Sequence, residues 1–173
     1  MIKTKGINHI ALVCRDMKET VRFYTEVLNM PLFKTVELPG GGQHFFFDCG
    51  GGAAVAFFWW EDGPPAAPGI ASVKHFPNEP KTAVGSMNHL AFEMEEGELE
   101  ASLQRLEEAG VPHTHAVVNH DDSPMGVSRD KHAGVFVRSV YFTDPNGIML
   151  EFAATTKEFG PDDVAHEPAT VDA

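Results

Sequence analysis

A motif repeated 80 positions apart (87 minus 7) limits how this chain can fold more than any other feature. Ile7–Leu12 has the sequence Ile-Asn-His-Ile-Ala-Leu, and Met87–Phe92 has the sequence Met-Asn-His-Leu-Ala-Phe. Both copies are apolar enough to form a strand, and each precedes a stretch with apolar residues at helical spacing. Internal similarity of this kind predicts a duplicated structural unit.

Further apolar runs, separated by turn-forming residues, complete each copy of the unit. Three more strands are expected in each half, at Leu32–Leu38, Gln43–Cys49 and Ala53–Trp59 in the first and at Pro112–Val118, Val135–Phe142 and Ile148–Ala153 in the second. Asp16, with Glu19 three residues later, predicts the start of the first helix, and Gly110 predicts the end of the second. The pattern indicates two βαβββ modules.

The module boundaries follow from changes in composition. The first module is expected over 6–60 and the second over 86–154, and together they are expected to form a single domain over 1–154. The intervening segment 61–85 contains five prolines, which predicts a linker or a lid. Residues 155–173 are predicted to be an acidic C-terminal tail.

Charge and composition exclude several classes of protein. The formal net charge of −12 argues against nucleic acid as a partner, because phosphates would be repelled. No apolar run approaches the ~20 residues of a membrane-spanning helix, so no membrane partner is expected. The two cysteines form no disulfide framework and are expected to be free thiols, which favours the cytosol.

Three side chains with metal-ligand chemistry occupy related positions. His9 and His89 hold the same place in the two copies, and Glu151 interrupts the apolar strand 148–153. Strand residues alternate between two faces, so all three side chains are expected on the concave face if helices cover the other. Two imidazoles and one carboxylate make a facial triad with positions left for water or substrate. Either histidine alone is better explained as a hydrogen-bonded core residue, but the repetition favours the metal site.

The segments that carry these residues resemble one superfamily. Asn8–Ala11 and the helix end Phe23–Met30 resemble the opening of a module of the vicinal oxygen chelate superfamily, and Asn88–Ala91 and Asp144–Glu151 resemble its other two ligand-bearing strands. That superfamily includes glyoxalases, bleomycin resistance proteins and extradiol dioxygenases. The resemblance covers about residues 6 to 154. It implies an α+β fold in which two βαβββ modules form a half-barrel around one divalent metal ion.

Within the superfamily, the chain most resembles the extradiol ring-cleaving dioxygenases. Their signature is matched by His132, Val140, Tyr141, Asp144, Pro145, Gly147 and Glu151, whereas Asp130 departs from it. The implied ligands of Fe(II), or of Mn(II) or another divalent ion, are His9, His89 and Glu151. The implied catalytic residues, which hydrogen-bond substrate or oxygen, are Tyr141 and His132. The implied activity is cleavage of a catechol-like aromatic substrate with O2.

Two positions depart from the relatives. Aligning the turn glycines of the two modules puts Ala56 opposite Glu151, so the fourth ligand that glyoxalases carry on this strand is absent, which favours a three-ligand site. Ring-cleaving dioxygenases place an acid–base histidine on the same strand, and the alignment gives Ala54 there. Three histidines remain as substitutes from elsewhere in the chain, namely His44, His75 and His120.

Other functions and assemblies stay open at this point. The same site would suit a non-oxidative lyase, isomerase or thiol transferase of the glyoxalase or fosfomycin-resistance type. A drug-binding resistance protein is the third alternative. The aromatic runs Phe45–Phe47 and Phe57–Trp60 fit either a substrate pocket or plain core. The superfamily forms its barrel within one chain or between two, and a homodimer is expected here.

Overall fold

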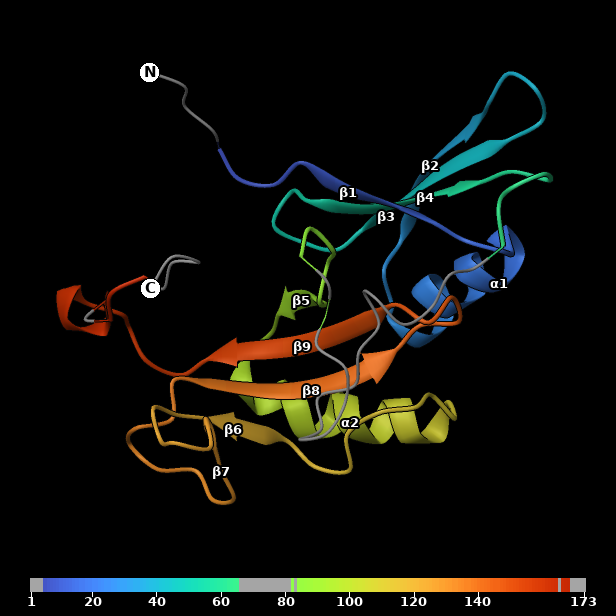
Figure 1. Cartoon of the computed structure of the whole chain (residues 1–173). Helices are drawn as coiled ribbons and strands as arrows, with labels where there is room; N and C mark the ends of the chain where they lie inside the picture. The colour runs from blue at the N-terminus through green and yellow to red at the C-terminus, as the bar shows by residue number, and fades with distance from the viewer. Residues whose placement is uncertain (1–4, 66–81, 83, 165, 169–173) are drawn as a thin grey trace.

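The computed structural model describes residues 5–65, 82, 84–164 and 166–168, and its strands form two sheets of related topology (Figure 1). The first sheet has the order β1-β4-β3-β2, from β1 (His9–Val13), β4 (Ala54–Trp59), β3 (Gln43–Asp48) and β2 (Leu32–Glu37). The second has the order β5-β9-β8-β6-β7, from β5 (Leu90–Glu93), β9 (Met149–Thr155), β8 (Val137–Thr143), β6 (Val118–His120) and β7 (Val127–Ser128). In each sheet the first strand of the unit pairs in parallel with the last. The expected α+β fold of two βαβββ units is confirmed.

The helices begin where the sequence places their caps. Helix α1 (Met17–Arg22) begins after Asp16, whose Oδ1 accepts a hydrogen bond from the Glu19 backbone N–H at 2.8 Å. It continues as the π-helix η1 (Phe23–Val27). The second module has the 3₁₀ turn η2 (Glu96–Glu98) and helix α2 (Leu99–Glu108), and a last 3₁₀ turn, η3 (Pro161–Val164), follows β9. None of the described helices is long and apolar enough to span a bilayer.

Contacts between the modules hold the two sheets in one body. The Arg105 side chain of α2 donates to the backbone oxygens of Val27 and Glu26 at 2.6 and 2.7 Å, at the end of η1. The Tyr24 hydroxyl donates to Asp144 Oδ2 at 3.4 Å, in the turn between β8 and β9. One hydrophobic core cluster includes residues of both modules. The first helix therefore helps to position β9.

The turn between β8 and β9 is compact and closed by hydrogen bonds. Gly147 has a left-handed φ of 83°, and its N–H donates to the Asp144 carbonyl at 3.0 Å. The Asp144 side chain accepts from the N–H groups of Asn146 and Ile148, both at 2.8 Å. This compact turn sets the register in which β8 and β9 present the site residues.

The second module departs from the expected strand 112–118. Only an isolated bridge at His113 forms there, and β6 begins at Val118. The reason is that the Thr114 hydroxyl accepts the Tyr141 N–H at 3.3 Å, where a backbone carbonyl would continue a ladder. The last strand runs to Thr155, two residues past its expected end. Most of the expected linker 61–85 lies outside the described residues.

Candidate metal centre

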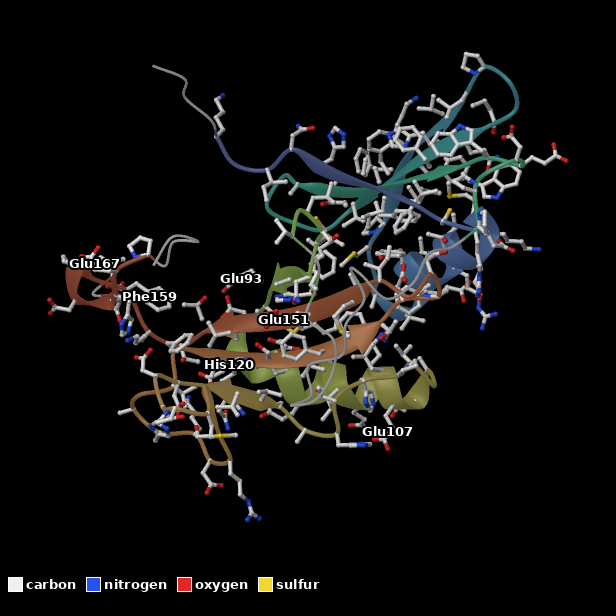
Figure 2. All side chains as sticks on the ribbon, in the orientation of Figure 1. Glu93, Glu107, His120, Glu151, Phe159 and Glu167 are labelled. Carbon is white, nitrogen blue, oxygen red and sulfur yellow. The ribbon has the colours of Figure 1, made fainter. Side chains whose placement is uncertain are left out.

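A buried carboxylate, that of Glu151, lies on the second sheet (Figure 2) and faces an imidazole. Glu151 lies in β9, and His89 lies directly before β5, the parallel neighbour of β9. His89 Nε2 is 2.8 Å from Glu151 Oε2, and the Ser139 hydroxyl donates to Glu151 Oε1. Burial raises the pKa of Glu151, but its contacts with His89, Ser139 and Tyr141 outweigh burial, so the net shift lowers the pKa. Glu151, only 4% exposed, is therefore a buried anion at neutral pH.

Both repeated histidines are oriented by the asparagine that precedes them. Asn88 Oδ1 lies 2.6 Å from His89 Nδ1, and Asn8 Oδ1 lies 2.8 Å from His9 Nδ1. An amide oxygen only accepts, so each contact requires the imidazole proton on Nδ1 and makes Nε2 the basic nitrogen. Metal-binding histidines are fixed in the same way by an acceptor behind the ring. The Asn-His pair of the repeat thus leaves Nε2 of each imidazole as the nitrogen that could bind a cation.

The contact between His89 and Glu151 requires a positive charge between the two side chains. With its proton on Nδ1, a neutral His89 turns a lone pair toward an anionic oxygen 2.8 Å away. That arrangement is favourable only if a second proton or a cation lies between the two atoms. Two ligands about 2.1 Å from an ion, at right angles to each other, are about 3 Å apart. The donor types and their spacing therefore fit a divalent metal ion.

His9, the third expected ligand, lies on the first sheet, apart from His89 and Glu151. It is exposed on β1, where its ring meets Phe46 edge-on at a centroid distance of 5.7 Å. Within the described part of the chain, no three His, Cys, Asp or Glu side chains lie close enough to hold a metal ion together. A single chain thus brings together His89 and Glu151 but not His9, because His9 belongs to the first sheet and the other two to the second.

The face of the first sheet that carries His9 is lined with rings. His44 and Phe58 stack in parallel with centroids 3.6 Å apart, and Phe58 and Trp60 stack in parallel at 5.1 Å. Val13, on the same face of β1 as His9, is 55% exposed. We define the aromatic ladder as His9, Phe46, His44, Phe58 and Trp60. An apolar face of this kind, open to solvent, is typical of a surface that binds a partner or a ligand.

Tyr141 links the carboxylate to a histidine that the sequence only named as a substitute. Tyr141 on β8 pairs with Glu151 on β9, so their side chains share the site face. The Tyr141 hydroxyl lies 3.1 Å from His120 Nε2. Burial, and then the charge of Glu151, raises the pKa of Tyr141 far above its usual range, so the phenol keeps its proton. His120 pairs with Val137 and shares this face. Strand alternation did not place it because the strand was expected to end at Val118.

The other histidines considered from the sequence have different surroundings. His132 Nε2 lies 3.0 Å from Asp121 Oδ2, and His132 Nδ1 accepts the Gly134 N–H at 3.0 Å. Both ring nitrogens are therefore engaged within one loop, and a role for His132 in substrate binding stays a prediction. His44 belongs to the aromatic ladder on the other sheet, and His75 lies outside the described residues.

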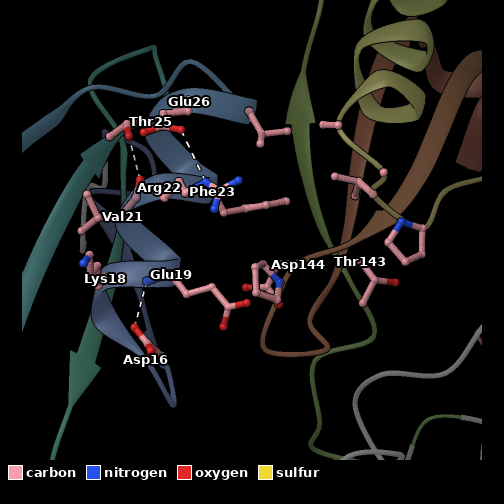
Figure 3. A pocket seen from close by; sticks show the side chains of 16 residues that line it. Asp16, Lys18, Glu19, Val21, Arg22, Phe23, Thr25, Glu26, Thr143 and Asp144 are labelled. Carbon is pink, nitrogen blue, oxygen red and sulfur yellow. Dashed lines mark hydrogen bonds and ion pairs between the residues drawn. The ribbon is translucent and has the colours of Figure 1, made fainter.

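A cavity of about 870 Å³ lies away from this pair, between α1 and the turn after β8 (Figure 3). Asp16, Lys18, Glu19 and Arg22 line one side, and Thr143 and Asp144 line the other. Neither His89 nor Glu151 borders it. Its charged lining has both signs, and it follows the junction of the two modules. The cavity is therefore a groove between modules and not the metal centre.

The duplicated βαβββ fold with a repeated Asn-His strand defines the class of vicinal oxygen chelate proteins. The family model described as Glyoxalase/Bleomycin resistance protein/Dioxygenase superfamily matches residues 6–152. The chain belongs to this superfamily. A search of curated proteins gives no match.

Solved structures share the fold. The protein SMU.1112c is 26% identical with a TM-score of 0.60, over 87% of this chain and 99% of that chain. A glyoxylase/bleomycin resistance protein/dioxygenase domain from Frankia sp. EAN1pec is 20% identical with a TM-score of 0.63, over 89% and 100%. A variant of the fosfomycin resistance protein FosX from Listeria monocytogenes, in complex with Mn(II) and a dihydroxypropylphosphonic acid, is 18% identical with a TM-score of 0.57, over 89% and 95%. These similarities establish the fold and leave the reaction to be argued from the site.

Proposed function

We propose that this protein is an Fe(II)-dependent dioxygenase that cleaves a catechol-like aromatic ring beside its two hydroxyl groups, using O2. The observation that carries the proposal is the buried Glu151 carboxylate that faces Nε2 of His89. The two adjacent oxygens of a catechol suit a centre with three protein ligands, because such a centre keeps positions for a bidentate ligand and O2. Tyr141 and His132 are the residues we propose to hydrogen-bond the substrate.

A divalent ion held here supplies Lewis-acid chemistry, since it polarises the oxygens that it binds. The chain's own residues prepare for this. Asn88 fixes the ring of His89, and Ser139 occupies Oε1 of Glu151, which directs Oε2 toward the ion. Tyr141 presents a protonated phenol on the same face as these groups.

We propose that the third ligand, His9, comes from a second copy of the chain. Each chain has one His89–Glu151 pair on the second sheet and one outward-facing His9 on the first. A two-fold dimer would complete two sites at once, because each chain gives its His9 to the other. The aromatic ladder would then cover the site, and its rings would suit a planar aromatic substrate.

Metal analysis and oxygen uptake test the function. Protein reconstituted with Fe(II) under argon is expected to hold iron and, once O2 is admitted, to consume O2 in step with an added catechol. His89→Ala is expected to abolish both properties. His115→Ala, which removes an exposed histidine from the same module, is the matched control. Protein that binds zinc tightly and consumes no O2 with any catechol would reject the proposal.

Hybrid dimers test whether the site is shared between chains. His9→Ala and His89→Ala chains are co-expressed with different affinity tags and purified through both tags. Each variant alone is expected to bind no metal. The hybrid is expected to bind half as much metal as the wild type, because one of its two sites combines the intact His9 of one chain with the intact His89 of the other. A hybrid that binds none would reject the shared site.

A non-oxidative lyase, isomerase or thiol transferase is the second candidate. The fold similarity to FosX solved with Mn(II) favours it. Two cations of the second module that could bind a phosphonate are already engaged, because Arg138 and Lys131 pair with Glu96 at 3.0 and 2.6 Å. Turnover under strict anaerobiosis would decide for this candidate. Binding of a cationic drug that chelators leave unchanged would instead favour a resistance protein.

We expect the protein to act in the cytosol. Cys14 and Cys49 are both free thiols, and Cys14 is buried. Free thiols fit a reducing compartment. Such a compartment also keeps iron in the ferrous state that the proposed reaction requires.

A further inference from the structure

A second carboxylate lies on the same face of the second sheet as Glu151 (Figure 2). In the parallel pairing of β5 with β9, Ala91 lies beside Glu151 and Glu93 lies beside Ala153. Alternate residues of a strand share a face, so Ala91 and Glu93 both belong to the face that carries the metal centre. The Glu93 side chain is exposed, and it forms no hydrogen bond or ion pair with the residues that the structure describes. Its carboxylate is therefore available to a ligand.

The spacing between the two carboxylates suits a substrate that has an arm on its ring. Residues two apart on a strand are separated by about 6.6 Å, and neighbouring strands by about 4.8 Å. Glu93 is one strand across and two residues along from Glu151, so their Cα atoms are about 8 Å apart. A catechol whose two oxygens lie beside Glu151 covers such a distance with its ring and a two-carbon arm. The end of the arm would then lie at Glu93.

The surface beside Glu93 has room for that arm. Its neighbour across the strand pair is Ala153, which has a small side chain. At the 80-residue offset of the repeat, Val13 holds the place of Glu93 in the first module, and Val13 pairs with Phe58. A phenyl ring thus covers the first sheet where a methyl group leaves the second sheet open.

The strands of the second sheet bring no cation to this face. Arg138 is the one Lys or Arg in the five strands that the structure describes there. It precedes Ser139 and so points to the opposite face, where its guanidinium pairs with Glu96 and Glu100 at 3.0 and 2.9 Å. An anionic arm would find no partner on these strands, whereas a cationic arm would find Glu93. The formal net charge of −12 also attracts cations to the protein as a whole.

We infer that this site takes catechols whose ring carries an arm ending in an ammonium group, and that Glu93 selects them. The inference rests on the proposed function, which supplies the catechol ring and its binding through two oxygens. An ion pair at a solvent-exposed position contributes modestly, so the preference over an uncharged arm of the same length is about fivefold in affinity. Glu93 contacts the arm and not the reacting oxygens, so it determines specificity and takes no part in the chemical step.

Three catechols that differ in the charge of the arm test the inference. The probes are 4-(2-aminoethyl)catechol, 4-ethylcatechol and 4-(carboxymethyl)catechol, and each is titrated by calorimetry under argon into the Fe(II)-loaded full chain. The wild type is expected to bind the amine about fivefold more tightly than the ethyl compound, and to bind the carboxylate least tightly. Added salt screens exposed charges, so the preference for the amine is expected to shrink as the salt concentration rises.

Three variants assign the preference to Glu93. Glu93→Gln is expected to bind the amine and the ethyl compound equally well, and Glu93→Lys is expected to prefer the carboxylate. Glu107→Gln removes one negative charge from an exposed position on α2 and is expected to keep the wild-type preference (Figure 2). If the wild type binds the three probes alike or prefers the carboxylate, or if Glu93→Gln still prefers the amine, the inference is overturned and the proposed function stands. If the wild type binds no catechol, the proposed function fails and the inference fails with it.

Discussion

The two modules share a strand register and differ in the side chains that they place on it. Ala11 pairs with Ala56 in the first sheet, and Ala91, which repeats Ala11, pairs with Glu151 in the second. Ala56 and Glu151 are therefore equivalent positions, and both are buried. One carries a methyl group, and the other carries an anion beside His89. The duplicated frame thus holds a histidine in both modules and places a carboxylate beside it in one.

The strands beside β4 and β9, which are β3 and β8, differ between the modules in the same way. Phe46 pairs with Ala56 where Tyr141 pairs with Glu151, so an apolar ring in the first module corresponds to a phenol in the second. The first module thus has its histidine in the aromatic ladder, and the second has its histidine beside the carboxylate of Glu151 and the phenol of Tyr141. The two equivalent faces therefore differ in character, one apolar and aromatic and the other polar.

The largest expected effect follows from removing the carboxylate that distinguishes the second module. Glu151→Gln keeps the shape of the side chain and removes its negative charge, so the affinity for a divalent ion is expected to fall more than about 100-fold. Metal titration followed by calorimetry measures the loss. Glu93→Gln, which changes an exposed carboxylate on β5, is the matched control. An unchanged affinity in Glu151→Gln would mean that the ion binds elsewhere.

The reverse change, a carboxylate in the first module, is expected to have the next largest effect. Ala56→Glu puts a carboxyl group at a fully buried position beside Phe46, so the free energy of unfolding is expected to fall by about 3 kcal/mol. Ala11→Glu lies on the same face but is exposed, and it is expected to change stability by less than about 0.5 kcal/mol. Urea unfolding measures both.

The outcome of Ala56→Glu also shows how far the equivalence of the modules extends. If a divalent ion restores the lost stability, the new carboxylate and His9 hold an ion as the equivalent pair does. Equal stability of Ala56→Glu and the wild type without metal would contradict the apolar role assigned to this position.

The two asparagines behind the repeated histidines are expected to matter equally. Asn8→Ala and Asn88→Ala each remove the acceptor of an Nδ1 proton, and each is expected to weaken metal binding about tenfold. Equal losses follow if His9 and His89 bind one ion, and the double variant should then lose about 100-fold in total. Competition against a coloured chelator measures these changes. A loss confined to Asn88→Ala would show that the first module holds no ligand.

The fold could be predicted from the sequence because its determinants are local. The Asp16 cap and the alternation around Glu151 each act within a few residues, and the structure bears them out. The strand expected at 112–118 did not form because of a contact between residues 27 positions apart in the sequence. Thr114 meets Tyr141, which is distant in sequence, and its hydroxyl takes the place of a backbone acceptor.

The candidate site could be predicted only in part for the same reason. Repetition and alternation single out His89 and Glu151, whose strands pair directly. The position of His9 depends on how the modules pack, and that is set by contacts such as Arg105 on the carbonyl of Val27, which no local pattern encodes. His120 depends on where a strand ends, and sequence patterns locate strand ends poorly.

The loop of the second module that contains Asp121 and His132 differs from the corresponding connection in the first module. The first module joins β2 to β3 by a short glycine-rich turn, whereas this loop contains its own ion pair, with His132 Nε2 3.0 Å from Asp121 Oδ2. Hydrogen bonds from the side chain and backbone of Ser123, together with that from His132, lower the pKa of Asp121 to about 2 from 3.8. The loop is therefore held by a carboxylate that prefers its ionised form in the folded state.

The smallest expected effect is a change in the acid dependence of stability. Because the folded-state pKa of Asp121 is lowered, its stabilising contribution is complete above about pH 3.8 and is lost as the pH falls toward about 2. Asp121→Asn is expected to be less stable than the wild type at neutral pH and to approach it near pH 2, as urea unfolding across this range would measure. Asp122→Asn, an exposed neighbour, should follow the wild type throughout. A constant difference between Asp121→Asn and the wild type from pH 7 to pH 2 would show that the carboxylate acts by shape and not by charge.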